Sequence, residues 1–214
     1  MKIAIIQGST QVDKNETLYK LVKKVTKDQG HEVYNFGVFK DETETYSYTE
    51  IALLVSLLLS SGVVDFVVTG CSSGQGMNMA CNSLPNVLCG FVQNPQDAFL
   101  FGRINDGNAV SLSLGLGYGW LGELNLEYTL EKLFDGEFGI GYPTEVAERK
   151  VRETKIVKTY NHLGKRTFLE LIEKLDDSII EKVFKKTDVI DFIVENTKNN
   201  EIRQYVMEVS GNGE

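Results

Sequence analysis

The sequence predicts a doubly wound α/β protein, with a parallel five-stranded sheet between two layers of helices and a helical extension at the C-terminus. Over residues 1–142, short apolar runs alternate with segments of helical spacing, and the links between them are short. Beyond Asp135 the pattern changes to highly charged segments with helical spacing only. Strands and helices that alternate in this way indicate a three-layer, Rossmann-like architecture. We therefore predict a core at 1–142 and an extension at 143–214.

Each core element follows from its local pattern. An apolar run opens the chain as the first strand, and Leu18, Leu21, Val22 and Val25 then share one face of a helix that Gly30 ends. The run at 63–69, dominated by Val and Phe, suits a strand buried on both sides. Strands are predicted at 2–7, 32–36, 63–69, 86–93 and 108–114, and helices at about 14–29, 49–60, 77–84, 95–101 and 120–134.

The extension is predicted to consist of helices only. Its expected helices cover about 144–156, 165–175, 177–185, 189–197 and 202–209. Apolar residues such as Phe168, Ile172, Ile180 and Phe184 can form a stripe that packs on the core or on a neighbouring subunit. A stabilising cap and a functional role both remain open for this segment. In the core, Trp120 is expected to pack at the start of its helix.

Composition limits the classes of function. The net charge of −8 argues against nucleic-acid binding, and no apolar run approaches the roughly 20 residues of a membrane span. From the N-terminal residues we expect no signal peptide. The odd cysteine count (Cys71, Cys81 and Cys89) indicates a reducing, cytoplasmic setting, in which Cys81 and Cys89 are expected in the core. With only two histidines and no CxxC pair, we expect neither a metal nor a cofactor.

The central feature is the segment 70–76, with three glycines and two serines between a strand and a helix. Its backbone N–H groups and the helix N-terminus can form an anion cradle. Cys71 lies at its edge, where a thiol next to backbone N–H groups can act as a base or a nucleophile. Alternatively, Cys71 is a small buried hydrophobic residue.

Several familiar uses of such a loop are excluded. A phosphatase loop requires an arginine where this chain has Met77, and a Cys–His hydrolase requires a histidine nearer than His31 or His162. Neither the Gly-Lys-Ser/Thr of a nucleotide P-loop nor the G-x-G-x-x-G of a dinucleotide site follows a predicted strand.

The segment 71–82, CSSGQGMNMACN, resembles the C-G-T-G-x-G-M-S-x-A-A-N motif of the RpiB/LacA/LacB sugar-phosphate isomerases. The similarity extends over about 140 residues. It includes the opening strand, Gly30-His31-Glu32-Val33, Asn94-Pro95, and 105–109, NDGNA, which is similar to the family's H-N-N-A-N with Ile104 at the place of its histidine.

The resemblance implies that aldose and ketose forms of a phosphorylated sugar interconvert through an enediolate, with Cys71 as the base. The target would be a pentose or hexose phosphate of the ribose-5-phosphate or galactose-6-phosphate type. The family also implies a homodimer with a shared site, or a tetramer. Besides Cys71, the candidate catalytic residue is Ser73; the candidate substrate-binding residues are Gly8, Ser9, Tyr46, Ser72, Gly74, Gln75, Gly76, Asn105, Asn108, Arg149 and Arg152.

The chain also departs from the family pattern. The family's Asp-His after the first strand is here Gly8-Ser9, and its ring-opening histidine falls on Ile104, which cannot transfer a proton. Asp106 or Gln93 acting through water could replace it, the substrate could arrive open-chain, or the chemistry could differ.

The supply of positive charge is also low. Between Asp41 and Glu131 the only basic residue is Arg103, so charge for an anionic substrate must come from Arg103, from the extension or from a second subunit. Two alternatives to the sugar-phosphate isomerase stay open. One is a non-catalytic or regulatory sugar-phosphate-binding protein, and the other is an isomerase or epimerase of an unphosphorylated or unusual sugar.

Overall fold

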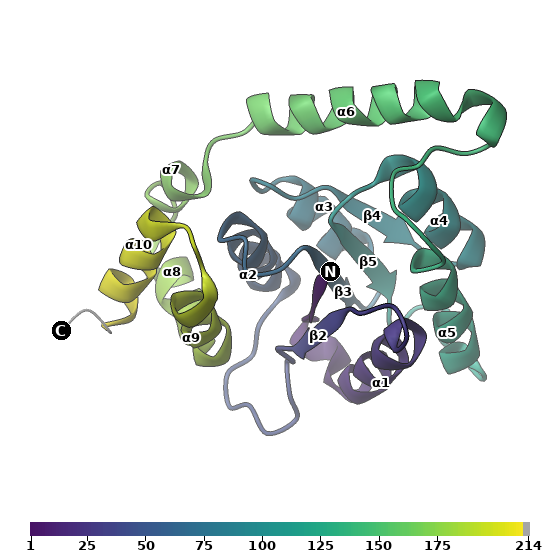
Figure 1. The fold of residues 1–214 in the computed structure, drawn as a ribbon. Coiled ribbons are helices and arrows are strands. Elements are labelled where there is room, and N and C mark those ends of the chain that lie inside the picture. The colour runs from purple at the N-terminus through teal and green to yellow at the C-terminus, as the bar shows by residue number, and fades with distance from the viewer. Residues whose placement is uncertain (212–214) are drawn as a thin grey trace.

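The computed structural model describes residues 1–211 and contains a parallel five-stranded sheet, which confirms the predicted fold class. The strand order is β2-β1-β3-β5-β4 (Figure 1). The strands are β1 (Lys2–Ile5), β2 (Glu32–Asn35), β3 (Phe66–Cys71), β4 (Cys89–Val92) and β5 (Ala109–Ser113). The connection after β1 leads toward one edge of the sheet, to β2, and the connection after β3 leads toward the other edge, to β4. The point where the winding reverses therefore lies between β1 and β3.

Helices cover both faces of the sheet because successive strand residues point to opposite sides. Ile3 and Ile5 of β1 pack against α1 and α5, whereas Ala4 of the strand and Ile6 just after it contribute to the core beneath α2 and α3. The core helices are α1 (Asn15–Thr26), α2 (Tyr48–Ser60), α3 (Gln75–Asn82), α4 (Pro95–Leu100) and α5 (Gly122–Leu133).

Four local details differ from the sequence prediction. The expected loop at 8–10 leads directly into a 3-10 helix, η1 (Ser9–Lys14), and α3 begins at Gln75 rather than at residue 77. α4 continues into a π-helical turn, η2 (Phe101–Asn105). The prediction that Trp120 packs at a helix start is wrong, because its side chain is 93% exposed.

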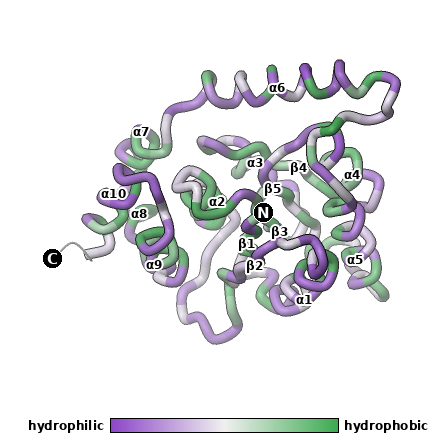
Figure 2. The backbone as a smooth tube through the Cα atoms, viewed as in Figure 1, coloured by the Kyte–Doolittle hydropathy of each residue, from purple (hydrophilic) through white to green (hydrophobic). Residues whose placement is uncertain are grey.

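The segment 143–214 is helical as far as it is described. After the short η3 (Thr144–Val146) come α6 (Ala147–Leu163), α7 (Phe168–Ile172), α8 (Asp177–Phe184), α9 (Thr187–Asn196) and α10 (Asn200–Ser210). α6 is a long, largely hydrophilic helix at the edge of the molecule, and it leads to the group α7–α10 beside α2 (Figures 1 and 2).

α2 connects the core to this helical group. Every residue from Ile51 to Leu58 is buried, so the helix has no face left for solvent. One apolar cluster contains Val67 of the sheet, Leu54 of α2 and Ile193 of α9 together. A helix that is apolar on all sides must be covered on all sides. The C-terminal helices supply the outer cover, and the predicted boundary at residue 142 stays a prediction.

We expect Ile193→Ala to lower the free energy of unfolding of the whole protein in a single transition, by about 2–5 kcal/mol, because Ile193 is fully buried. Ile179→Ala, at a side chain that is 39% exposed, is the matched control and should change stability by less than about 1 kcal/mol. Denaturant unfolding followed by tyrosine fluorescence and circular dichroism measures both. Two separate transitions, of which only one responds to Ile193→Ala, would show instead that the extension folds on its own.

Candidate active site

Cys71 is the last residue of β3, at the carboxyl edge of the sheet and next to the point where the winding reverses. Ligands of doubly wound sheets bind at this point. The thiol is partly exposed, and the carbonyl of Cys71 accepts a hydrogen bond from Leu114 N at 3.0 Å. The residue before it, Gly70, has no room for a side chain, because a Cβ there would lie 2.5 Å from the Leu112 carbonyl oxygen. β3 and β5 therefore approach closely, and the thiol emerges where the strand ends.

The loop after Cys71 presents backbone donors. Gly74 has φ = 74°, in the left-handed region, and caps α3. Within residues 1–211, the N–H groups of Ser73, Gly74 and Gly76 make no hydrogen bond to the protein. The Ser73 hydroxyl oxygen accepts from Gln75 N at 3.3 Å, which leaves its proton available for another acceptor. This arrangement has the geometry of the anion cradle predicted from the sequence, with a thiol at its edge, and the binding of an anion there stays a prediction.

The end of β1 forms the adjacent wall. Gly8 N donates to the Gly70 carbonyl at 3.1 Å, so the predicted residues Gly8 and Ser9 lie directly beside the Cys71 loop. Gln11 Nε2 donates to Ser72 Oγ at 2.8 Å, and Thr10 Oγ1 lies 3.3 Å from the same hydroxyl. Thr10 and Gln11 were not among the residues predicted from the sequence, because only the turn of η1 brings them back over the loop.

Tyr46 contacts this wall with its backbone and not with its ring. Tyr46 N donates to Ser9 Oγ at 2.7 Å, and Ser9 N donates to the Tyr46 carbonyl at 3.0 Å. The ring is buried and lines a separate cavity of about 370 Å³ that also contains Glu42 and Glu44. Burial, followed by these two carboxylates, raises the pKa of Tyr46 to about 12. Tyr48, whose ring is 3.5 Å from a Cβ built on Gly76, is the tyrosine next to the cradle.

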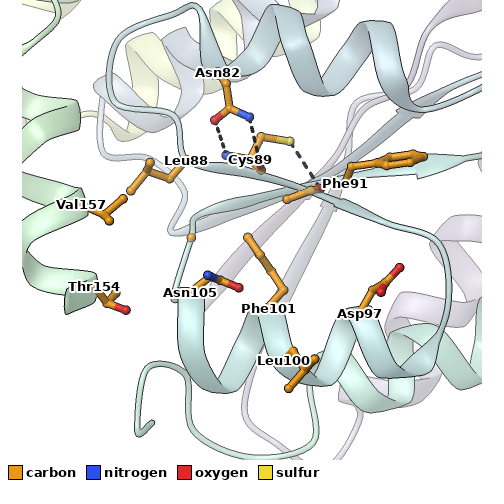
Figure 3. A pocket seen from close by; sticks show the side chains of 12 residues that line it. Asn82, Leu88, Cys89, Phe91, Asp97, Leu100, Phe101, Asn105, Thr154 and Val157 are labelled. Carbon is orange, nitrogen blue, oxygen red and sulfur yellow. Dashed lines mark hydrogen bonds between the residues drawn. The ribbon is translucent and has the colours of Figure 1, made fainter. Parts of the chain in front are cut away.

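Asn105 and Asn108 do not lie near Cys71 within one chain. Asn108 immediately precedes β5, where its side chain accepts from Leu88 N at 2.8 Å and donates to the Asn86 carbonyl at 2.7 Å. Cys71 is paired with Ser113 at the other end of β5, roughly 16 Å away at about 3.3 Å per residue. Asn105 is exposed and lines a cavity of about 440 Å³ beside the edge strand β4, together with Asn82, Thr154 and Val157 (Figure 3).

The basic residues considered for an anionic substrate are engaged elsewhere. Arg103 is 3% exposed and donates to the carbonyls of Leu133 and Asp135 at the end of α5, and burial lowers its pKa. Arg149 pairs with Glu153 at 2.9 Å and Arg152 with Glu148 at 3.9 Å, on exposed positions of α6. Asp106, a candidate for the missing acid, is paired with Lys158 of α6.

Residues 1–211 contain no cluster of three or more histidine, cysteine, aspartate or glutamate side chains arranged to hold a metal. Across the same residues, no helix is both long and apolar enough to cross a bilayer. The cytoplasmic location stays a prediction.

The fold and the site together define a parallel α/β protein with a thiol and a cradle of N–H groups at its ligand-binding edge. Residues 3–140 match the family model described as ribose/galactose isomerase, LacAB_rpiB. The chain belongs to this family, as the motif at 71–82 indicated. It is therefore a sugar isomerase, an intramolecular oxidoreductase.

Two solved structures match nearly the whole chain, including the C-terminal helices. One is described as a 4-deoxy-L-threo-5-hexosulose-uronate ketol-isomerase complexed with a tartrate; it is 39% identical, with a TM-score of 0.92, over 98% of this chain and 99% of that one. The other is a ribose-5-phosphate isomerase LacAB_rpiB from Vibrio parahaemolyticus, 36% identical, with the same TM-score and the same coverage.

A type B ribose 5-phosphate isomerase from Trypanosoma cruzi shares the fold at 21% identity and a TM-score of 0.60. The match spans 98% of that chain but only 75% of this one. About a quarter of the present chain therefore has no counterpart in that protein.

We expect Gly74→Ala to lower the free energy of unfolding by about 2–4 kcal/mol and to abolish activity, because its Cβ would lie 2.6 Å from the Phe91 ring and 2.9 Å from the Leu112 backbone. Gly117→Ala is the matched control. Gly117 also has a positive φ, of 73°, but open space around it, so only about 1 kcal/mol should be lost. Urea titrations and activity assays measure both, and equal losses for the two variants would contradict the packing argument.

Proposed function

We propose that this protein is a ketol-isomerase of an unphosphorylated, open-chain sugar acid, with Cys71 as the base that moves a proton between C1 and C2. The observation that carries the choice of substrate is Ile104, which occupies the position where the resemblance expects a ring-opening histidine. An isomerase without that acid suits a substrate that has no ring to open.

The uronate in the description of the 39% identical protein has this property. Its name specifies a carbonyl at C5 and no hydroxyl at C4. Neither O4 nor O5 is therefore available to close the usual five- or six-membered ring on C1. A carboxylate at C6 takes the place of a phosphate as the terminal anion. The engagement of Arg103, Arg149 and Arg152 with other groups also favours a substrate that needs less positive charge than a phosphate dianion.

The proposed reaction uses groups that the chain brings together. The Cys71 thiolate removes the proton from C2 of the hydroxyaldehyde, and the electron pair forms the C1=C2 bond while O1 takes the negative charge. The N–H groups of Ser73, Gly74 and Gly76 stabilise this enediolate, which is the largest contribution in reactions of this type. The Ser73 hydroxyl transfers a proton from O2 to O1, and the Cys71 thiol returns its proton to C1, which leaves a ketone at C2.

A second candidate is the isomerisation of a pentose phosphate. The 36% identical protein described as a ribose-5-phosphate isomerase supports it, because it matches the same 98% of this chain. Cationic groups from a second subunit would then have to hold the phosphate.

We also propose that two subunits share each site, as the resemblance implies. One chain places Asn105 and Asn108 away from its own Cys71, so a single subunit leaves the site incomplete. Exposed apolar side chains lie beside the cavity that Asn105 lines and along the helices that border it. These are Met79 of α3 and Ile156, Val157, Tyr160 and Leu163 of α6.

We expect deuterium from heavy water to enter the substrate at the carbon that Cys71 deprotonates, as followed by NMR. The panel contains the 4-deoxy-5-hexosulose uronate and the phosphates of ribose and galactose. The uronate should be labelled fastest. Cys71→Ala should slow labelling by about 10²- to 10⁴-fold, the usual contribution of a general base. Cys81→Ala, which removes a buried thiol of the same chain, is the control.

Faster labelling of a sugar phosphate than of the uronate would overturn the proposed substrate in favour of the second candidate. Binding of a sugar without labelling of any compound would contradict the isomerase mechanism and support a binding protein.

We expect inactive variants to complement each other if the site is shared. Cys71→Ala and Asn105→Ala, each nearly inactive alone, should recover about one quarter of wild-type activity after denaturation and refolding of an equal mixture. Half of the dimers are then mixed, and each mixed dimer has one intact site. A mixture of Cys71→Ala with Cys71→Ser is the control and should recover nothing. No recovery in the first mixture, with mixed dimers detected by native mass spectrometry, would contradict a shared site.

A further inference from the structure

The segment 36–47 between β2 and α2 has no regular secondary structure, yet it borders the candidate active site. On its inner side it is bonded to the end of β1. Gln7 N donates to the Gly37 carbonyl at 2.8 Å, and Gln7 Nε2 donates to the Val38 carbonyl at 2.9 Å. The two hydrogen bonds between Ser9 and Tyr46 follow at the far end of the segment. The position of Ser9 therefore depends on the position of this segment.

On its outer side the segment is held by a lysine from the C-terminal helices. Lys186 precedes α9, and its side chain is only 3% exposed. Its ammonium group lies 2.8 Å from Glu42 Oε1 and 3.0 Å from Asp188, over the ring of Phe39. The same Glu42 oxygen accepts from Phe39 N at 2.8 Å, so the carboxylate joins the lysine to the backbone of the segment.

A second lysine acts closer to Tyr46. Lys182 of α8 pairs with Glu44, and its ammonium group is 5.3 Å from the centre of the Tyr46 ring. The hydrogen bond from Lys182 is the largest cause of the lowered pKa of Glu44. We call Lys182 and Lys186, with Glu42 and Glu44, the lysine clamp.

Coverage of α2 alone does not explain the lysine clamp. Apolar residues such as Ile190 and Ile193 already cover α2. A lysine buried against carboxylates loses its hydration, and apolar replacements of such pairs are often equally stable or more stable. What the charged pairs add is a defined position for Glu42 and Glu44, and through them for the segment that holds Ser9.

We propose that Lys182 and Lys186 are positioning residues of the active site, which fix Ser9 beside the Cys71 loop by holding the segment 39–46 from outside. The C-terminal extension is then part of the catalytic apparatus rather than a cap. The catalytic consequence rests on the proposed function; the attachment of Ser9 does not.

The test uses the Lys182–Glu44 pair, because both side chains are partly exposed (27% and 36%), so that exchanged charges at these positions would stay in contact with water. Lys185 also lies 3.7 Å from Glu44, so all variants of this pair are made in a Lys185→Gln background. There, Lys182→Glu and Glu44→Lys each break the pair, and the double variant restores it with the charges exchanged. Lys24→Glu, which breaks the ion pair between Lys24 of α1 and Glu127 of α5, is the matched control on the other face of the sheet. Hydrogen exchange of the Ser9 and Tyr46 amides, KM, kcat and the melting temperature are measured for each variant.

Each single variant should speed exchange at Ser9 and Tyr46 by about three- to tenfold, as expected for the replacement of one partly exposed ion pair by a repulsion. KM should rise by a similar factor while kcat changes little, because Ser9 is expected to bind substrate. The double variant should restore both values, and Lys24→Glu should change neither.

Simple loss of stability would instead lower kcat through the fraction of folded enzyme and leave KM unchanged. That result, unchanged exchange at Ser9 and Tyr46, or faster exchange with unchanged KM would overturn the proposal. A wild-type protein that isomerises no sugar would contradict the proposed function, and the exchange rates would still report whether the clamp holds Ser9.

Discussion

The close approach of β3 to β5 is the constraint on which the candidate site depends. No Cβ fits at Gly70 against the Leu112 carbonyl, and none fits at Gly74 between Phe91 and the Leu112 backbone. The two glycines allow the loop to pack directly against β5. Ser111 Oγ of β5 also donates a hydrogen bond to the Gly74 carbonyl at 2.6 Å. The thiol of Cys71 and the N–H groups of the loop consequently meet at one point, where a carbanion and its oxygen charge can be stabilised together.

The sequence allowed the core fold to be predicted because its strands and helices alternate with clear periodicity. The cradle could also be predicted, since glycines at fixed places between a strand and a helix indicate one type of turn. The role of Tyr46 was harder to predict. Its backbone contacts Ser9 while its ring lies in another cavity, and no local sequence pattern shows that the backbone and the ring point to different places. Gln11 and Thr10 went unnoticed for a related reason: they reach the loop only through the turn of η1, which sequence spacing did not reveal.

The basic side chains discussed above are paired with groups of the protein itself and not with the cradle. Arg103 donates to a carbonyl at the end of α5, and Arg149 and Arg152 pair with glutamates of α6. Lys182 and Lys186 pair with glutamates of the segment beside Ser9. The cradle itself relies on backbone dipoles. Such a site suits a substrate whose negative charge develops during the reaction more than one that arrives with two charges in place.

The burial of α2 on all sides has a consequence for the synthesis of the protein. Residues 51–58 leave the ribosome long before α8 and α9, which pack on their outer face. About 140 further residues must be made first, which takes roughly 7–28 s at the usual 5–20 residues per second. During that interval the most apolar helix of the described residues has an uncovered face, and the core around it is complete only after α8 and α9 have been made.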